Sequence, residues 1–199
     1  MRGEVTEIRT ARGKATIVFA SGASFSMPAP MARECPGLTA GTEADTSELE
    51  KYLSEHGMPY ALAQCAQMAS RRDYTRREVK DALLVRGYPE AIAQQAVEQA
   101  SRAGLISDDR SAQSLLRRRS RTHGRGAIAQ EMRRRGIDRE TAQNALEEMD
   151  EETEKAAAVR LAQKLLARGK TREQAYAALL RRGYSRTVAY GAVMTSNFD

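Results

Sequence analysis

Three short motifs of an arginine, a glycine and an apolar residue constrain the fold of this chain more than any other feature. They are Arg86-Gly87-Tyr88, Arg135-Gly136-Ile137 and Arg182-Gly183-Tyr184, which lie 49 and 47 residues apart. In the same register, apolar residues coincide at further positions, among them Val79 with Ile128 and Ala175. Each glycine separates two apolar helical runs, as a glycine does when it ends a helix in the left-handed conformation. The motifs therefore predict three copies of a helical repeat.

Each repeat is expected to hold three helices, about nine in all. The first helix of each comes from residues near 60–70, 110–120 and 154–168. Capping boxes at Thr75–Glu78 and Thr171–Gln174 mark matched starts of the second helix. Units this small bury little on their own, so neighbouring repeats should pack against each other. The expected fold class is mainly α, with three tandem three-helix repeats in an elongated body, straight or curved.

The first 59 residues have a different pattern. Apolar residues between residues 4 and 27 recur in short segments separated by turn residues, which predicts two or three antiparallel strands. After several prolines and glycines, a capped helix begins at Thr46, and Gly57 and Pro59 are expected to end it. We therefore predict a small β-plus-helix extension over residues 1–59, followed by repeats over 60–109, 110–153 and 154–199.

Composition indicates a soluble, largely helical protein. Of the 199 residues, 41% are hydrophobic but only 5% are aromatic, and small aliphatic side chains suit helix faces better than sheets. No apolar run reaches the roughly 18 residues of a membrane span, and no secretory signal core follows Met1. Cys35 and Cys65 lack CxxC spacing and only two histidines are present. We therefore expect a cytoplasmic protein with free thiols and with no metal or cofactor.

Positive charge is concentrated after residue 59. Residues 1–59 carry six Lys and Arg against eight Asp and Glu, a net charge of −2, whereas the remaining residues carry 26 against 18, a net charge of +8. A basic region of this kind favours an anionic partner, most often nucleic acid. Ordinary solvated helix faces are the alternative interpretation.

The densest positive segment runs from Arg117 to Arg135 and holds eight arginines against one acid, Glu131. Guanidinium groups bind phosphate and carboxylate through two hydrogen bonds, so the segment suits a DNA backbone or an acidic protein surface. Basic residues also recur before the second helix of the other repeats, which could form a stripe for a linear polyanion. The predicted partner-binding or DNA-binding residues are Arg71, Arg72, Arg76, Arg117, Arg118, Arg121, Arg125, Arg133, Arg134, Lys170 and Arg172. Alternatively, these basic residues only offset the partial negative charge of the carbonyls at helix ends.

Two neighbouring motifs have competing interpretations. Gly124 and Gly126 predict a turn between helices, with a phosphate-binding loop as the alternative. The acidic stretch from Glu147 to Glu154 predicts a solvated helix or intramolecular partners for arginines, with metal binding as the alternative.

Aromatic residues and catalytic motifs narrow the function. Exposed aromatic side chains are not interleaved with the arginines, which argues against stacking of bases. Tyr88 and Tyr184 align with Ile137, which predicts core positions, so binding should be nearly indifferent to base sequence. The chain has no GxSxG, GxxxxGK[ST] or HExxH motif. We therefore do not expect an enzyme.

The motifs after residue 60 resemble those of the RecX family. The first repeat carries Arg72-Asp73-Tyr74-Thr75-Arg76-Arg77-Glu78-Val79 followed by Leu83 and Arg86-Gly87-Tyr88, and the second carries Gly124, Ile128, Glu131, Met132 and Arg135-Gly136-Ile137. The segment Gly104-Leu105-Ile106-Ser107-Asp108-Asp109-Arg110-Ser111-Ala112 also resembles a family motif. Ser111 departs from the pattern where the family usually has a large aromatic residue, and Arg125 departs where it often has proline. The β-containing start is similar to the extension of longer members.

The resemblance implies a monomeric negative modulator of RecA recombinase. Such a protein binds the RecA filament on single-stranded DNA along its groove and inhibits ATP hydrolysis, strand exchange and filament extension, which affects DNA repair and the SOS response. The partners implied are RecA and single-stranded DNA, with double-stranded DNA as a further candidate, and no membrane. The alternative is a helical protein that binds DNA without sequence preference, in an architectural or regulatory role.

Overall fold

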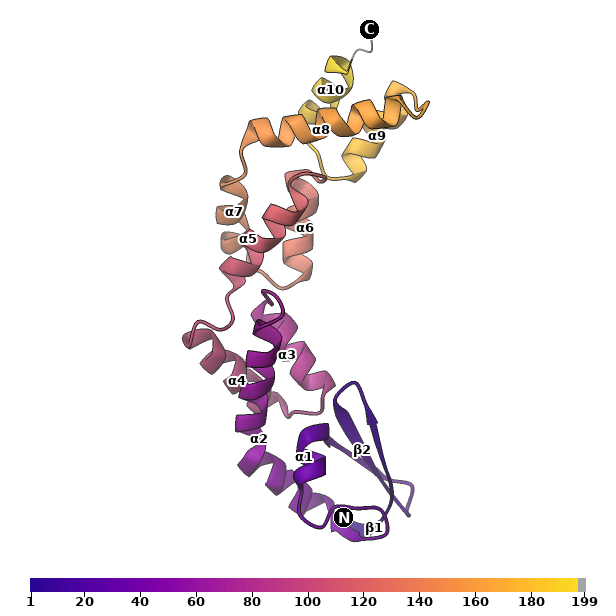
Figure 1. The fold of residues 1–199 in the computed structure, drawn as a ribbon, viewed down its shortest axis with the longest axis vertical. Coiled ribbons are helices and arrows are strands. Elements are labelled where there is room, and N and C mark those ends of the chain that lie inside the picture. Colours follow the sequence, from indigo (N-terminus) through magenta and orange to yellow (C-terminus); the bar gives the residue numbers. More distant parts are fainter. Residues whose placement is uncertain (197–199) are drawn as a thin grey trace. The chain divides into compact units, whose positions relative to one another are not determined.

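The computed structural model describes residues 1–196 and divides the chain into two compact units (Figure 1). Unit 1 is Met1–Ser107 and unit 2 is Asp108–Asp199. The last three residues of the expected third repeat, 197–199, lie outside the described residues. Within residues 1–196, no helix is long and apolar enough to cross a membrane.

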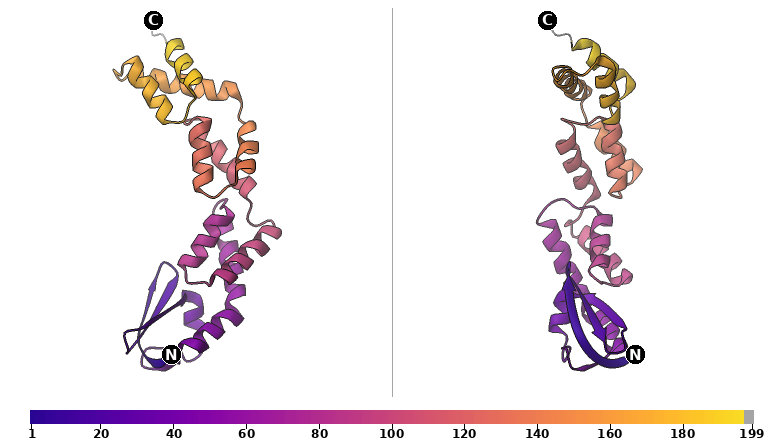
Figure 2. Two further views of the ribbon diagram at one scale, coloured as in Figure 1. Left: turned by 180° about the vertical axis from the view of Figure 1, so that it is seen from behind. Right: turned by 90° about the vertical axis from the view of Figure 1, so that its right-hand side faces the viewer.

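Unit 1 begins with an antiparallel sheet. Its strands are β1 (Arg2–Ala11), β2 (Lys14–Phe19), β3 (Ser24–Pro28) and β4 (Glu43–Asp45), in the order β3-β2-β1-β4. Alternate residues such as Val5, Ile17 and Phe19 are fully or almost fully buried and share a core with the helices. The predicted β segment is confirmed, and the structure adds β4 and the short helix α1 (Ala29–Glu34). Figure 2 shows the strands beside α1 from two further sides.

The helix that begins at Thr46 is much longer than expected. Helix α2 (Thr46–Ala69) passes through both Gly57 and Pro59, so the prediction that these residues end it is wrong. Gly57 is buried, and a Cβ atom there would lie 2.8 Å from Cδ1 of Ile92. The glycine therefore lets α4 (Glu90–Arg102) approach α2 closely, and this packing favours a continuous helix. A boundary at residue 59 would lie inside α2, and the four-part division of the chain stays a prediction.

The predicted repeats are built of three helices each. The first repeat consists of α2, α3 (Arg76–Val85) and α4. The second consists of α5 (Asp108–Arg119), α6 (Arg125–Arg134) and α7 (Arg139–Glu147), and the third of α8 (Glu151–Leu166), α9 (Arg172–Arg181) and α10 (Arg186–Thr195). Both predicted capping boxes are present, at the starts of α3 and α9. The second and third repeats each have a small apolar core.

The three Arg-Gly motifs form the same turn. Gly87, Gly136 and Gly183 have φ angles of 89°, 84° and 79°, in the left-handed region that glycine adopts most easily. The residue after each glycine donates its N–H five residues back, as Tyr88 does to the carbonyl of Leu83 at 3.2 Å. This bonding pattern closes a helix C-terminus. The predicted helix ends are confirmed, and so are the core positions of Tyr88 and Tyr184, which are 5% and 3% exposed.

Ser111 lies in α5 at a fully buried position. Its hydroxyl oxygen has no hydrogen-bond partner among the described residues. A buried hydroxyl in that state costs about 1–3 kcal/mol. The serine hydroxyl therefore lowers the stability of the second repeat compared with an apolar side chain of similar size.

Candidate partner-binding face

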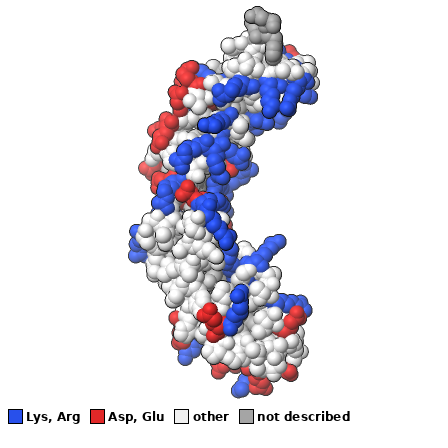
Figure 3. Space-filling view, viewed as in Figure 1, with Lys and Arg blue, Asp and Glu red and all other residues white. Residues whose placement is uncertain are grey.

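The arginines of the second repeat gather around the end of α5 and along α6. Five of them are exposed and make no ion pair or side-chain hydrogen bond within residues 1–196, and we call these the open arginines. They are Arg117, Arg118, Arg121, Arg133 and Arg134. In Figure 3 the Lys and Arg side chains of unit 2 lie on the side of α6 and α9, while Asp and Glu collect near α7 and the start of α8. One side of unit 2 is therefore strongly positive.

Two arginines of the same segment serve the fold instead. Arg119 places its Nε 3.1 Å from Oε2 of Glu131, which joins α5 to α6. Arg125 is the first residue of α6, and its Nε lies 3.1 Å from Oε2 of Glu154. These two guanidinium groups neutralise carboxylates of their own chain, so fewer charges face a partner than the sequence suggests.

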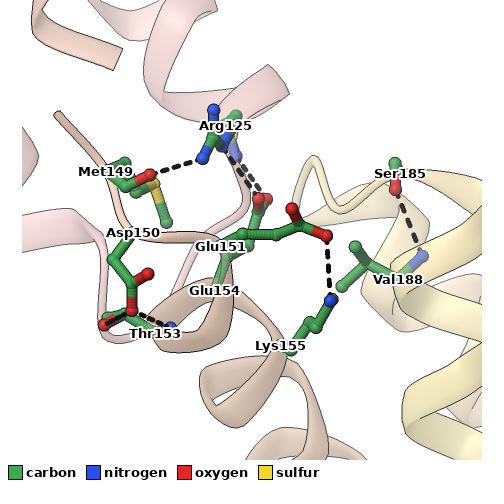
Figure 4. Close-up of polar contacts among 9 residues, drawn as sticks. All are labelled: Arg125, Met149, Asp150, Glu151, Thr153, Glu154, Lys155, Ser185 and Val188. Carbon is green, nitrogen blue, oxygen red and sulfur yellow. Dashed lines mark hydrogen bonds and ion pairs between the residues drawn. The ribbon is translucent and has the colours of Figure 1, made fainter. Parts of the chain in front are cut away.

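Arg125 and Glu154 connect the second and third repeats (Figure 4). The backbone N–H of Arg125 donates to Oε1 of Glu154 at 2.9 Å, and the guanidinium also donates to the carbonyl of Met149. Because the N-cap Gly124 has no side chain to offer, the carboxylate of Glu154 both caps α6 and offsets the positive charge at its start. Arg125 was predicted to contact a partner, whereas the structure gives it this internal role. The prediction that the acidic stretch supplies partners for arginines is confirmed.

We expect removal of Glu154 to destabilise this connection. Its side chain is only 7% exposed and satisfies both the backbone and the side chain of Arg125. Replacing Glu154→Ala should lower the free energy of unfolding by about 1–3 kcal/mol, measured by urea denaturation. Glu152→Ala is the matched control, because Glu152 is 79% exposed and, within residues 1–196, forms an ion pair with Lys155 alone, so that change should cost under about 1 kcal/mol. Equal effects of the two changes would contradict the role assigned to Glu154.

Gly124 and Gly126 belong to the same connection. Their N–H groups donate to the carbonyls of Arg182 and Gly183 at 3.0 and 3.1 Å. A Cβ atom on Gly183 would lie 2.1 Å from the nitrogen of Ala127. The turn interpretation is therefore correct, and the phosphate-loop alternative is wrong because these N–H groups are already bonded.

The predicted residues of unit 1 lie at the turn between α2 and α3. Arg71 and Arg76 are exposed, and Arg76 starts α3. Arg72 pairs with Glu78 at 3.2 Å and lies over the ring of Tyr74, 3.6 Å from its centre. Burial of part of the side chain is the largest single influence and lowers the pKa of Arg72, but the hydrogen bond and the charge of Glu78 together with Tyr74 outweigh it, so the net shift is upward. Arg72 thus stabilises the entry to α3 and stays charged.

In the third repeat, Lys170 lies in the turn before α9 and Arg172 is the first residue of that helix, and both are exposed. Together with the open arginines they place seven of the predicted residues on the surface of unit 2, while Arg125 is partly withdrawn. The stripe through all three repeats remains a prediction.

A groove between α6 and α7 adds a residue that the sequence did not reveal. The groove has a volume of about 590 Å³ and its floor is formed by small and apolar side chains such as Ala129 and Leu146. Arg133 from α6 and Arg139 from α7 line it together with Arg125. Arg139 lies outside the dense arginine segment, so only its position across the groove shows its relation to Arg133. We call this the second-repeat groove.

Family models match the chain in two places. The model of the RecX first three-helix domain matches residues 61–99, and that of the second three-helix domain matches residues 107–146. A regulatory protein RecX of Mycolicibacterium vanbaalenii is 32% identical over 147 residues, which cover 67% of this chain and 80% of that protein. A regulatory protein RecX of Thermobifida fusca is 33% identical over 143 residues, covering 67% of this chain and 76% of its own.

Solved structures show the same fold. A crystal structure of a regulatory protein RecX matches with a TM-score of 0.65 at 21% identity, covering 96% of this chain and 98% of that one. The structure of RecX from Lactobacillus salivarius matches with a TM-score of 0.64 at 22% identity, covering 70% and 96% of the two chains. With the repeated helices, their left-handed glycine turns and the matching sequences, this chain belongs to the RecX family of regulatory proteins.

Proposed function

We propose that this protein is a negative modulator of the RecA recombinase. In this proposal it binds the RecA filament on single-stranded DNA along its groove and inhibits ATP hydrolysis, strand exchange and filament extension, and thereby affects DNA repair and the SOS response. Membership of a family of regulatory proteins supports the regulatory role. The observation that carries the proposal further is the set of open arginines in unit 2.

The charges suit a filament that combines protein and DNA. Guanidinium groups bind phosphate oxygens and carboxylates with the same fork of donors, so the open arginines can contact either component. Contacts at several repeats that are each weak become strong together when one chain makes them simultaneously. The candidate contact residues are the open arginines with Arg71, Arg72, Arg76, Lys170 and Arg172, which join them from the other repeats.

The test is the rate of ATP hydrolysis by RecA on single-stranded DNA. We expect the rate and the filament length to fall even when this protein is far less abundant than RecA. One molecule that blocks the end of a filament prevents many further RecA subunits from adding to it. If inhibition appears only when the protein covers all the DNA, competition for DNA explains it and the filament-specific proposal fails. That outcome would favour the alternative, a DNA-binding protein that does not act on RecA.

A further inference from the structure

The second-repeat groove has a counterpart in the third repeat. A groove of about 220 Å³ lies between α9 and α10, and five of its six lining residues occupy positions equivalent to residues that line the groove between α6 and α7. It is lined by Arg172, Glu173, Tyr176, Tyr190, Val193 and Met194. We call it the third-repeat groove. Two successive repeats therefore have a groove at the equivalent position, but different side chains line it.

The difference between the two grooves lies in two tyrosines. In the repeat register, Tyr176 replaces Ala129, and Tyr190 replaces Gln143. In the first repeat the equivalent of Tyr176 is Lys80, whose Nζ lies 3.0 Å from Oε1 of Glu90 and bridges α3 to α4. The aromatic pair is thus confined to the third repeat, and the common fold does not require it.

A role in the core does not explain the exposure of Tyr190, whereas Tyr176 also packs against the apolar core of the third repeat. Tyr190 is 60% exposed and Met194 is 44% exposed, whereas Tyr184 in the core of the same repeat is 3% exposed. Tyr176 is half-buried and forms the other wall of the groove. Two aromatic side chains that line one open groove provide flat apolar surfaces, which a planar ligand can contact.

Positive charge accompanies each tyrosine. Arg172 precedes Tyr176 by four residues on α9, and Arg186 precedes Tyr190 by four residues on α10, so each arginine shares a helix face with its tyrosine. Arg168 and Lys170, also exposed, lie in the turn that leads into α9. Among residues 1–196, Glu173 is the one acidic residue that lines the groove. The surroundings favour a ligand that is planar and negatively charged.

We infer that the third-repeat groove binds a base of single-stranded DNA against Tyr176 and Tyr190, while the neighbouring basic residues hold the adjacent phosphates. Every nucleobase has a flat π-face, so such binding tolerates any sequence. An apolar side chain of a protein would use the tyrosines but not Arg172 and the basic residues of the adjoining turn and helix. The inference rests on the proposed function, because the filament supplies the single-stranded DNA. It differs from the expectation drawn from the sequence that bases do not stack on this protein, because Tyr190 is exposed near basic residues of the third repeat.

The test compares two oligonucleotides of equal length, one of thymidines and one with the same backbone but abasic sugars. Fluorescence anisotropy of the labelled oligonucleotides gives both dissociation constants at one low salt concentration. We expect the complete chain to bind the thymidine oligonucleotide about 5- to 10-fold more tightly than the abasic one, as one stacked base predicts. Tyr190→Gln, which installs the residue of the second repeat, should reduce this ratio to about one.

Two controls separate stacking from other effects. Tyr190→Phe retains the ring and should retain the ratio, and Gln143→Ala changes the equivalent position of the second repeat and should also retain it. Equal binding of the two oligonucleotides by the unchanged protein, or no binding to either, would overturn the inference. A binding ratio that is unchanged in Tyr190→Gln would also overturn it. If this variant keeps the ratio but inhibits RecA less, the groove binds a protein side chain and not a base. The ATP hydrolysis assay judges the proposed function separately, so loss of the ratio with intact inhibition leaves that proposal standing.

Discussion

Replacing Gly183→Ala is expected to lower the free energy of unfolding of unit 2 by about 2–5 kcal/mol. The left-handed backbone at this residue, with φ of 79°, costs a non-glycine residue about 1–2 kcal/mol. The added Cβ would also lie 2.1 Å from the backbone nitrogen of Ala127, and relief of such overpacking costs about 1–3 kcal/mol more. Urea denaturation measures the total, and hydrogen exchange of the amides in α6 and α9 locates it.

Gly169 provides a matched control for this change. It has nearly the same φ angle, 78°, but a Cβ atom there would meet no described residue within 4 Å. Gly169→Ala should therefore cost only about 1–2 kcal/mol. Gly124→Ala tests the contact from the other side, because its φ of −78° suits alanine while the Cβ would lie 2.4 Å from the carbonyl oxygen of Gly183. If Gly183→Ala costs no more than Gly169→Ala, the two repeats are not held by close backbone contact.

Reversing the charge of four open arginines should have the largest effect on function. We expect the combined change of Arg117, Arg121, Arg133 and Arg134 to glutamate to weaken binding to the RecA filament by at least about 100-fold near 0.1 M salt. On single-stranded DNA the salt dependence of binding should fall by about 3 in its logarithmic slope, since each lost phosphate contact removes about 0.7. Helicity should be unchanged, because these side chains make no ion pair within residues 1–196.

The control must separate position from net charge. Changing Arg2, Arg9, Arg12 and Lys51 to glutamate alters the net charge equally but affects exposed residues of β1, α2 and the turn after β1. Arg2, Arg9 and Lys51 pair with exposed carboxylates, and each such pair contributes at most about 1 kcal/mol to stability. Binding measured by anisotropy and by inhibition of ATP hydrolysis should then change by less than about tenfold. Similar losses in both variants would mean that overall charge governs binding, and the open arginines would lose their assigned role.

Local features of the fold were predictable from the sequence because neighbouring residues determine them. Thr75 and Glu78, three residues apart, cap α3 by reciprocal hydrogen bonds between their side chains and backbone N–H groups. Gly87 ends the same helix because glycine adopts the left-handed backbone conformation most easily. Strand β4 could not be predicted in this way. It has three residues without an apolar pattern and forms because Gly3 and its neighbours in β1 pair with Ala44 and its neighbours.

The site shows the same division between local and distant contacts. The sequence shows that arginines are dense between Arg117 and Arg135. It does not show which of them are exposed and which pair within the chain, because the pairing depends on contacts between distant segments. Arg125 and Glu154 are 29 residues apart, and Gly124 meets a turn that lies 58 residues further on. From the sequence alone, Gly57 likewise predicts the end of a helix. In the structure it allows the close approach of Ile92, which is 35 residues further along the chain. The pairing of Tyr176 with Tyr190 was not predictable from the sequence, because the packing of α9 against α10 brings them to one groove.

The connection between the second and third repeats is made largely of main-chain atoms. Gly124 and Gly126 bond to the carbonyls of Arg182 and Gly183, and these carbonyls are independent of side-chain identity. Substitutions on the outer faces of both repeats can therefore accumulate while the joint is preserved, provided that the glycines remain. Such a joint lets a family diversify what its members recognise without redesigning the scaffold, and it discourages loss of a single repeat, which would leave donors of the remaining one without acceptors.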